Sequence, residues 1–66
     1  MEAKIISIKN IYKEDGRYYV DYDVEYRNGE IEHRAKVFDT FREAGISKSE
    51  LKVYLNRWKT QLVLGL

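Results

Sequence analysis

The sequence predicts an α+β domain in which a three-stranded antiparallel sheet is covered on one face by a C-terminal helix. Two patterns support this fold class. Tyrosine and valine alternate with charged residues over positions 17–27, which is the period of a strand with one buried and one solvated face. After position 50, apolar residues recur at the spacing of one helix face, at Leu51, Tyr54, Leu55, Trp58 and Leu62.

Length and composition predict one small domain, residues 1–66. The chain contains no cysteine, which excludes disulfides and thiolate metal sites. Because it has no apolar run of about 18 residues and no signal peptide, we expect no membrane span and a cytoplasmic location. The abundance of Lys, Glu, Ile and Tyr is typical of a protein from a thermophile.

The first strand is predicted over residues 3–13 and the second over 17–27, with a turn between them. A two-residue loop, Asp15-Gly16, turns Lys9 and Ser7 into the core. A three-residue loop, 14–16, sets Lys9 against Asp21 and turns apolar side chains inward instead, namely Tyr12, Ile8 and Ile6. The hydrophobic pattern therefore favours the three-residue loop.

The second β-hairpin is predicted to close through a two-residue type I′ loop at Asn28-Gly29, a strong hairpin signal. The third strand then covers residues 30–38. In this register Tyr26 lies opposite Ile31, and the third strand turns four side chains toward the core: Ile31, His33, Ala35 and Val37. On the solvated face, the expected cross-strand ion pairs are Asp23–Arg34 and Asp21–Lys36.

A short helical turn is predicted over residues 40–44, directly after the sheet. Thr40 and Glu43 have the spacing of a capping box, in which each side chain satisfies a backbone N–H of the other residue. Gly45 suits the left-handed position that ends such a turn.

The main helix is predicted over residues 48–63, packed on one face of the sheet. Ser47 and Glu50 form a second capping box, and Ile46 and Leu51 have the spacing of a hydrophobic staple. At the other end we expect Gly65 to cap the helix, with Leu66 folded back as its hydrophobic contact.

No residue pattern indicates catalysis, a metal site or a cofactor. His33 is the only histidine, and it lacks the converging partners that a metal or proton-transfer site needs. We expect it to be a packed side chain with one hydrogen bond. A row of carboxylates on the second strand, Asp21, Asp23 and Glu25, suits either a cation site or a solvated lattice of ion pairs. The lattice, with Lys9, Arg34 and Lys36 as partners, is the more economical interpretation, so we expect a non-enzymatic protein.

The C-terminal part carries a small excess of positive charge. Residues 39–66 hold five basic and three acidic residues, whereas residues 1–38 hold seven basic and eight acidic ones. A basic helix flank contacts phosphates readily, although a merely solvated helix face explains the same charges. The residues predicted to bind nucleic acid are Ser47, Lys48, Ser49, Lys52, Asn56, Arg57 and Lys59.

Two segments resemble DNA-binding families. Residues 41–58, FREAGISKSELKVYLNRW, resemble the second half of a helix-turn-helix in their Ala-Gly-apolar turn and later apolar positions: Ala44, Gly45, Ile46, Leu51 and Tyr54. This resemblance implies a recognition helix over 48–58 that reads bases from its first turn. Residues 18–44, with the motif Phe38-x-Thr40-x-x-Glu43-Ala44, resemble the arm-type N-terminal DNA-binding domain of tyrosine-family integrases. That resemblance implies a three-stranded sheet that enters the major groove.

An apolar patch is predicted on the outer sheet face, where the expected register places Ile11, Tyr19 and Phe38 side by side. Val53 lies on the back of the helix. A cross-strand trio of large apolar residues indicates either a covering segment, for which 39–45 is the candidate, or a partner such as a second copy of the chain. These four residues form the predicted partner interface.

The sequence thus predicts a small, non-enzymatic regulatory protein that binds nucleic acid, specifically duplex DNA, through the basic flank of its helix. The alternative is a protein-interaction module or inhibitor that uses the apolar patch, with a protein partner or a homodimer. Neither a small-molecule substrate nor a membrane is expected.

Overall fold

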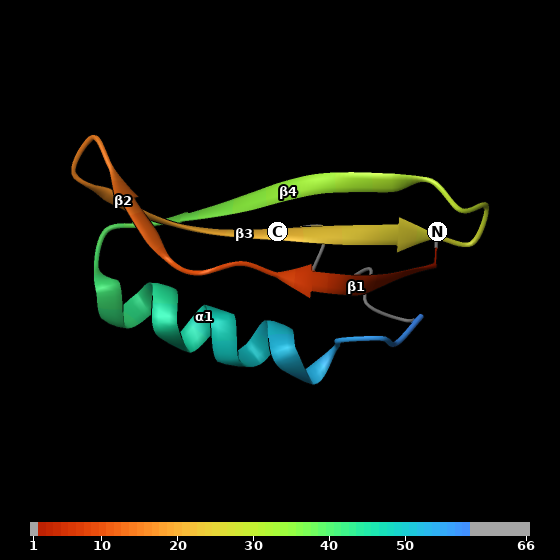
Figure 1. Cartoon of the computed structure of the whole chain (residues 1–66). Coiled ribbons are helices and arrows are strands. Elements are labelled where there is room, and N and C mark those ends of the chain that lie inside the picture. The colour runs from red at the N-terminus through yellow and green to blue at the C-terminus, as the bar shows by residue number, and fades with distance from the viewer. Residues whose placement is uncertain (1, 59–66) are drawn as a thin grey trace.

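Four antiparallel strands and one helix make up residues 2–58, the part of the chain that the computed structural model describes (Figure 1). The strands are β1 (Ala3–Ile8), β2 (Tyr12–Glu14), β3 (Arg17–Tyr26) and β4 (Ile31–Phe38), and the helix is α1 (Phe41–Val53). The predicted fold class is therefore confirmed. The predicted first strand differs in one respect, because residues 9–11 interrupt it and divide it into β1 and β2.

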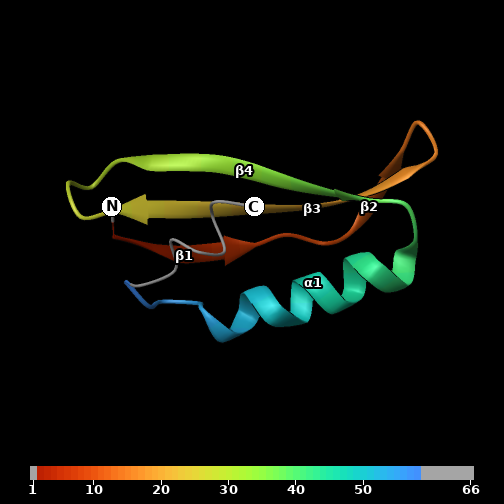
Figure 2. The same cartoon turned by 180° about the vertical axis from the view of Figure 1, so that it is seen from behind.

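The strand β3 is the centre of the sheet. β1 and β2 follow one another along one of its edges, and β4 lies along the other (Figures 1 and 2). The helix packs on one face of this sheet and contacts β1, β3 and β4. The core between the two layers contains Ala3, Ile5, Val20, Tyr22, Val24, Ala44 and Leu51. The predicted inward face of β3 and the predicted contact of Leu51 are thus correct.

The first turn has two residues rather than the predicted three. Asp15 and Gly16 have φ values of 51° and 80°, as a type I′ turn requires, and Glu14 lies opposite Arg17. The prediction is wrong because it assumed one uninterrupted register along the whole first strand. The chain instead shifts register at the break over 9–11 and again between Ile5 and Ser7.

These shifts decide which side chains of the first strand reach the core. Ile8 lies opposite Tyr22 and packs against the core, as predicted. Lys9 also meets Asp21 as expected, through a 2.8 Å backbone hydrogen bond. Because of the irregularity between Ile5 and Ser7, it is Ile5 and not Ile6 that is fully buried. Tyr12, predicted to point inward, lies opposite Tyr19 on the other face.

The second turn has three residues, 27–29, rather than the predicted two. The Gly29 N–H donates to the Tyr26 carbonyl (2.9 Å), and Gly29 has a φ of 89°. Asn28 lacks the positive φ that a type I′ loop needs, and its Oδ1 accepts from the Glu30 N–H (3.0 Å). This geometry is a type I turn followed by a glycine bulge. It shifts the pairing of β4 with β3 by one residue from the predicted register.

The one-residue shift exchanges the two faces of β4. Tyr22 lies opposite Arg34 and Val24 opposite Glu32, so the predicted register is wrong. The side chains of Ile31, His33, Ala35 and Val37, predicted to be buried, lie on the face away from the helix. The hydrophobic pattern does not decide between the registers, because Phe38 and the aliphatic stems of Arg34 and Lys36 offer apolar surface on the opposite side.

One helix replaces the two that the sequence predicts. It begins after Thr40, whose Oγ1 accepts from the Glu43 N–H (3.1 Å) and donates to Glu43 Oε1 (3.0 Å). The predicted cap at Thr40 is thus confirmed, with the difference that Glu43 accepts from the Thr40 hydroxyl and not from its backbone N–H. Gly45 continues the helix, and Ser47 is a buried mid-helix residue. Continuing through one glycine costs about 1 kcal/mol, whereas a second helix requires a new nucleus, which is unfavourable.

The helix ends at Val53, ten positions before its predicted end at 63. Asn56 adopts a left-handed φ of 64°, and the chain then runs beside β1. The Asn56 N–H donates to the Ile5 carbonyl (2.8 Å), and the Ala3 N–H donates to the Trp58 carbonyl (2.9 Å). Trp58 therefore does not lie on the helix: its ring packs against Lys4 and Arg27, whose charged groups are 4.7 and 4.6 Å from the ring centroid.

The predicted positions of Leu62, Gly65 and Leu66 lie outside the described residues. Within residues 2–58, no helix has both the length and the apolar character needed to cross a membrane.

Candidate interaction surfaces

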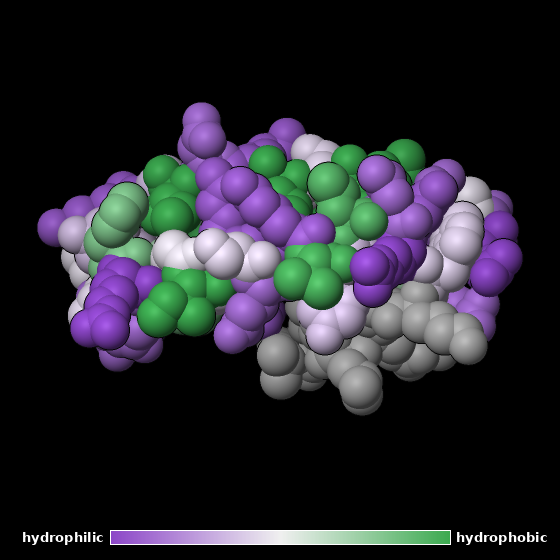
Figure 3. Space-filling model, turned by 90° about the horizontal axis from the view of Figure 1, so that it is seen from below, coloured by the Kyte–Doolittle hydropathy of each residue, from purple (hydrophilic) through white to green (hydrophobic). Residues whose placement is uncertain are grey.

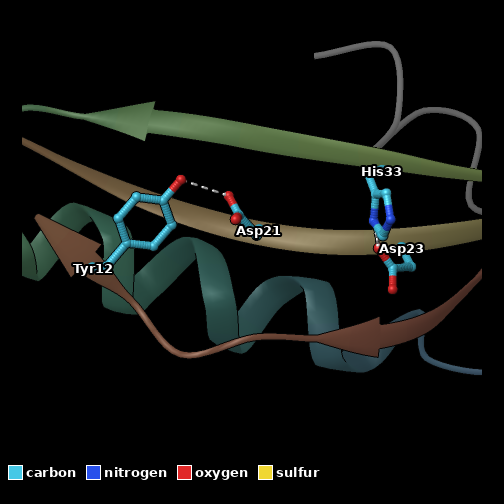
Figure 4. A network of polar contacts seen from close by, with 4 residues as sticks. All are labelled: Tyr12, Asp21, Asp23 and His33. Atoms are coloured by element: carbon cyan, nitrogen blue, oxygen red, sulfur yellow. Dashed lines mark hydrogen bonds and ion pairs between the residues drawn. The ribbon is translucent and has the colours of Figure 1, made fainter. Parts of the chain in front are cut away.

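The face of the sheet turned away from α1 is here called the open face. Side chains from all four strands lie on it, and Lys4 of β1 lies opposite Glu25. Those of β2, β3 and β4 include Tyr12, Tyr19, Asp21, Asp23, Glu25, Ile31, His33, Ala35 and Val37. Figure 4 shows four of them on the three strands, with the helix behind the sheet. This face has two kinds of surface, a row of partnered carboxylates along β3 and apolar side chains along β4.

A pair of stacked tyrosines occupies the β2 end of the open face. The rings of Tyr12 and Tyr19 lie 5.2 Å apart between centroids and are 8° from parallel. The Tyr12 hydroxyl donates to Asp21 Oδ1 at 3.2 Å. Loss of hydration raises the pKa of Tyr12, and the hydrogen bond to the Asp21 carboxylate and its negative charge raise that pKa further.

His33 lies beside Asp23 on the open face, with its Nδ1 in contact with Asp23 Oδ1 (Figure 4). The imidazole is otherwise exposed, whereas the Asp23 side chain is largely covered. The prediction of a packed histidine opposite Val24 is wrong, because the shifted register sets His33 opposite Asp23. The predicted single hydrogen bond is present, with this carboxylate as the partner.

Each carboxylate of β3 has a partner of its own. Asp21 accepts from Tyr12, Asp23 contacts His33, and Glu25 pairs with Lys4 at 3.6 Å. The expected partnering is thus present, but with other partners. The predicted Asp23–Arg34 and Asp21–Lys36 pairs are wrong because they follow from the wrong register of β4. Lys9 does lie against Asp21, but through its backbone N–H and not through a side-chain ion pair. No group of three or more acidic or histidine side chains within residues 2–58 is arranged to hold a metal ion.

An apolar row follows β4 across the open face. It consists of Ile31, Ala35 and Val37, and it is exposed, with 59% of Ile31 and 47% of Val37 accessible to solvent. Val37 lies opposite Tyr19, so the row continues into the stacked tyrosines. Sequence reasoning missed this row because it placed these residues in the core.

The predicted interface residues do not come together. Ile11 and Phe38 pack against the core, and Phe38 lies opposite Tyr18 on the helix side of the sheet. Tyr19 alone of the trio is on the open face. Val53 is 58% exposed on the outer side of α1. The predicted trio is therefore wrong as a surface, although the outer sheet face does carry apolar residues.

The predicted nucleic-acid residues are only partly accessible. Ser47 is 6% exposed and packs toward the sheet, so its predicted place near the bases is wrong. Lys48 is half-buried, whereas Ser49, Lys52, Asn56 and Arg57 are exposed, and Lys59 lies outside the described residues. Lys48 and Lys52 are four residues apart in α1 and share one flank.

Arg42 is an exposed cation on the first turn of α1 that sequence reasoning missed. A helix starting at Phe41, as the Thr40 cap indicates, would have included it. The helix side of the molecule also carries exposed apolar residues, Phe41, Ile46 and Val53, and Figure 3 shows hydrophilic surface between the apolar groups on this side. Glu43 and Glu50 lie on the flank opposite Lys48 and Lys52, so the flank of these two lysines is positive.

A polar network covers the helix side of β4. The Tyr26 hydroxyl and Arg34 Nε both donate to Glu32 Oε1, at 2.9 and 2.7 Å. These hydrogen bonds, Arg34's first and Tyr26's second, lower the pKa of Glu32. Burial raises the pKa of the neighbouring Tyr22, and Arg34 opposes this shift.

Comparison with models of protein families, with curated proteins and with solved structures finds no match to this chain.

Proposed function

We propose that this protein is a non-enzymatic interaction module whose open face docks another protein. The observation that carries the proposal is the exposed apolar row, Ile31, Ala35 and Val37, on the face that the helix leaves uncovered. The helix buries the apolar side chains of the opposite sheet face, and the hydrophobic core forms there without the residues of this row.

The composition of the open face suits a protein partner. Protein interfaces join an apolar centre to a polar rim and are enriched in aromatic residues, tyrosine among them. Here Val37 adjoins the stacked rings of Tyr12 and Tyr19, which offer a flat and rigid apolar surface. The carboxylates Asp21 and Asp23 beside them already have partners. The face therefore offers a preorganised apolar patch beside a row of acidic side chains on β3.

The carboxylates of β3 disfavour a polyanion on this face. Nucleic-acid affinity depends mostly on cations that neutralise phosphates, and the middle of the open face carries Asp21, Asp23 and Glu25. The insertion of this sheet into a major groove, as the integrase resemblance implies, is not supported by these charges.

Site-specific photo-crosslinking tests the docking proposal. A benzophenone residue replaces Val37 on the open face or, as the control, Ile46 on the outer side of α1, which has similar exposure. Each protein is irradiated in an extract of the source cells. We expect position 37 to give a discrete adduct with a different polypeptide, and Tyr19→Glu to abolish it. Adducts from position 46 alone, or only with nucleic acid, contradict the proposal.

A second candidate function, binding of duplex DNA through α1, is favoured by one observation. Arg42, Lys48, Lys52 and Arg57 form no ion pair with another residue of the described chain. Unpaired cations on α1 and shortly after its end are available to phosphates. Loss of two phosphate contacts reduces the steepness of the salt dependence by about two.

Fluorescence anisotropy with a labelled duplex tests this candidate. Lys48→Ala/Lys52→Ala is expected to weaken binding and flatten its salt dependence, whereas Lys9→Ala, at an exposed position opposite Asp21, is the control. Equal loss in both variants, or no binding by the natural chain at low salt, contradicts DNA binding through this flank.

A further inference from the structure

The two long edges of the sheet differ in how they are covered. Beside β1 runs the segment after the helix, with a parallel bridge between Ile5 and Leu55 and hydrogen bonds from Asn56 and to Trp58. β4 pairs with β3 on one side, and within residues 2–58 no strand pairs with its other side. β4 is thus an eight-residue strand with an open edge.

The backbone groups that point off this edge follow from the turn. The Tyr26 N–H donates to the Glu30 carbonyl, so Glu30 directs its backbone groups toward β3. In an antiparallel pair this direction alternates with every residue. The N–H and C=O groups of Ile31, His33, Ala35 and Val37 therefore point outward, available to another strand.

The charges beside this edge are self-complementary. On the helix side of the strand, alternate positions carry Glu32, Arg34 and Lys36, and Glu30 directly before the strand continues the series, so that two acids are followed by two bases. An antiparallel copy presents the same series in reverse. With His33 opposite His33 of the second copy, Glu32 faces Arg34 and Glu30 faces Lys36, each pair twice.

Neighbouring registers lose this match. A shift of one residue places backbone groups of one copy that point away from β3 opposite groups of the other copy that point toward its own β3. The hydrogen bonds between the two β4 strands are then lost. The next permitted registers place Arg34 opposite Arg34, or Glu32 opposite Glu32, and like charges directly opposite are destabilising. The charge order of β4 therefore selects a single register.

We propose that two copies of this chain pair antiparallel along β4, with a two-fold axis at His33, to form one continuous sheet. Glu32 and Arg34 already pair within the strand, and in the dimer they form a four-member network with their counterparts. On the other side, Ile31 lies beside Ala35 of the second copy, so the two apolar rows adjoin. The pairing uses the edge of the sheet and stands independently of the docking function proposed for its face.

A charge swap tests the proposal without altering the apolar row. Glu30→Lys places like charges against Lys36, and Lys36→Glu places them against Glu30. Neither Glu30 nor Lys36 forms an ion pair among the described residues. Sedimentation velocity on the full chain is expected to show association from 7.9 kDa toward twice that mass. Each single variant should weaken dimerisation by about tenfold, as expected for two reversed cross-strand pairs, and Glu30→Lys/Lys36→Glu should restore it.

Controls fix both the surface and the register. Lys52→Glu on α1 should leave dimerisation unchanged. Because the natural chain has no cysteine, His33→Cys should form a disulfide between copies on oxidation, since residues opposite one another in a ladder lie within disulfide reach. A chain that stays monomeric at millimolar concentration overturns the proposal. So does a double variant that dimerises no better than the single ones, or a disulfide that forms readily from Ala35→Cys but not from His33→Cys.

Discussion

Tyr12 lies flat against Tyr19 across the β2–β3 pair, and its hydroxyl donates to Asp21 on the same face. This arrangement depends on the break in the first strand, because Ile8, four residues earlier, points to the opposite face. Because of the break, Ile8 points to the core and Tyr12 points to the open face, although both lie along the same edge of β3.

The Tyr12–Asp21 contact predicts a tyrosine that ionises late. The raised pKa means that the neutral phenol is favoured in the folded state. Its contribution to stability is complete below the unfolded value of about 10 and is lost as pH rises through the folded pKa. Ring NMR shifts followed against pH should show Tyr12 titrating later than a free tyrosine, and Asp21→Asn should move its pKa down. A Tyr12 that titrates normally in the natural chain contradicts the contact.

The Thr40 cap predicts a specific loss of stability. Thr40→Ala leaves the Glu43 N–H without its side-chain acceptor and should lower the free energy of unfolding by about 1 kcal/mol. Ser49→Ala, at an exposed mid-helix position, is the control; it removes no cap and should leave the free energy of unfolding unchanged or raise it by a few tenths of a kcal/mol. Urea denaturation of the two variants measures the difference. Equal stability of the two variants would show that the helix does not begin at Thr40.

Replacing two glycines by alanine is expected to change the free energy of unfolding in opposite directions. Gly16 has a φ of 80°, so Gly16→Ala is strained and should destabilise the chain. Gly45 lies within α1 with no atom within 4 Å of an added Cβ. Gly45→Ala should therefore stabilise by up to about 1 kcal/mol through helix propensity. Thermal unfolding of both variants gives the signs, and a destabilised Gly45→Ala contradicts a continuous helix.

The network around Glu32 predicts acid sensitivity on the helix side of β4. Hydrogen bonds from Arg34 and Tyr26 lower the Glu32 pKa in the folded chain. This contribution is present above the unfolded pKa of about 4.3 and is lost as pH falls through the folded value. Carboxyl NMR titration should show the pKa of Glu32 rising in Arg34→Gln and, to a smaller extent, in Tyr26→Phe. Similar pKa values in all three proteins would argue against these hydrogen bonds.

Sequence patterns predicted the central strand and its core because one signal dominated there. The alternation of Tyr18, Val20, Tyr22 and Val24 has no competing interpretation, and the three buried members confirm it. The Thr40–Glu43 spacing located a real helix start for the same reason. Local signals of this kind depend on neighbours in the sequence, which are known before folding.

The register of β4 was harder to predict because it depends on small free-energy differences summed over cross-strand pairs whose members are far apart in the sequence. Asn28-Gly29 suits both a two-residue loop and a three-residue loop with a glycine bulge, and β4 has apolar surface on both sides. The choice between the loops moved every side chain of β4 to the other face. The apolar patch therefore has different members from those predicted, while the cations of α1, whose exposure does not depend on β4, mostly remain at the surface.

The bridge between Ile5 and Leu55 has a consequence for how far self-assembly proceeds. It covers the β1 part of the border of the sheet farthest from β4, so within residues 2–58 β1 presents no free edge at Ile5 for β4 of another molecule. Head-to-tail pairing of β4 on β1, a geometry that leads from sheet proteins to filaments, is therefore obstructed. The two-fold pair is then a closed dimer and not the first step of a filament.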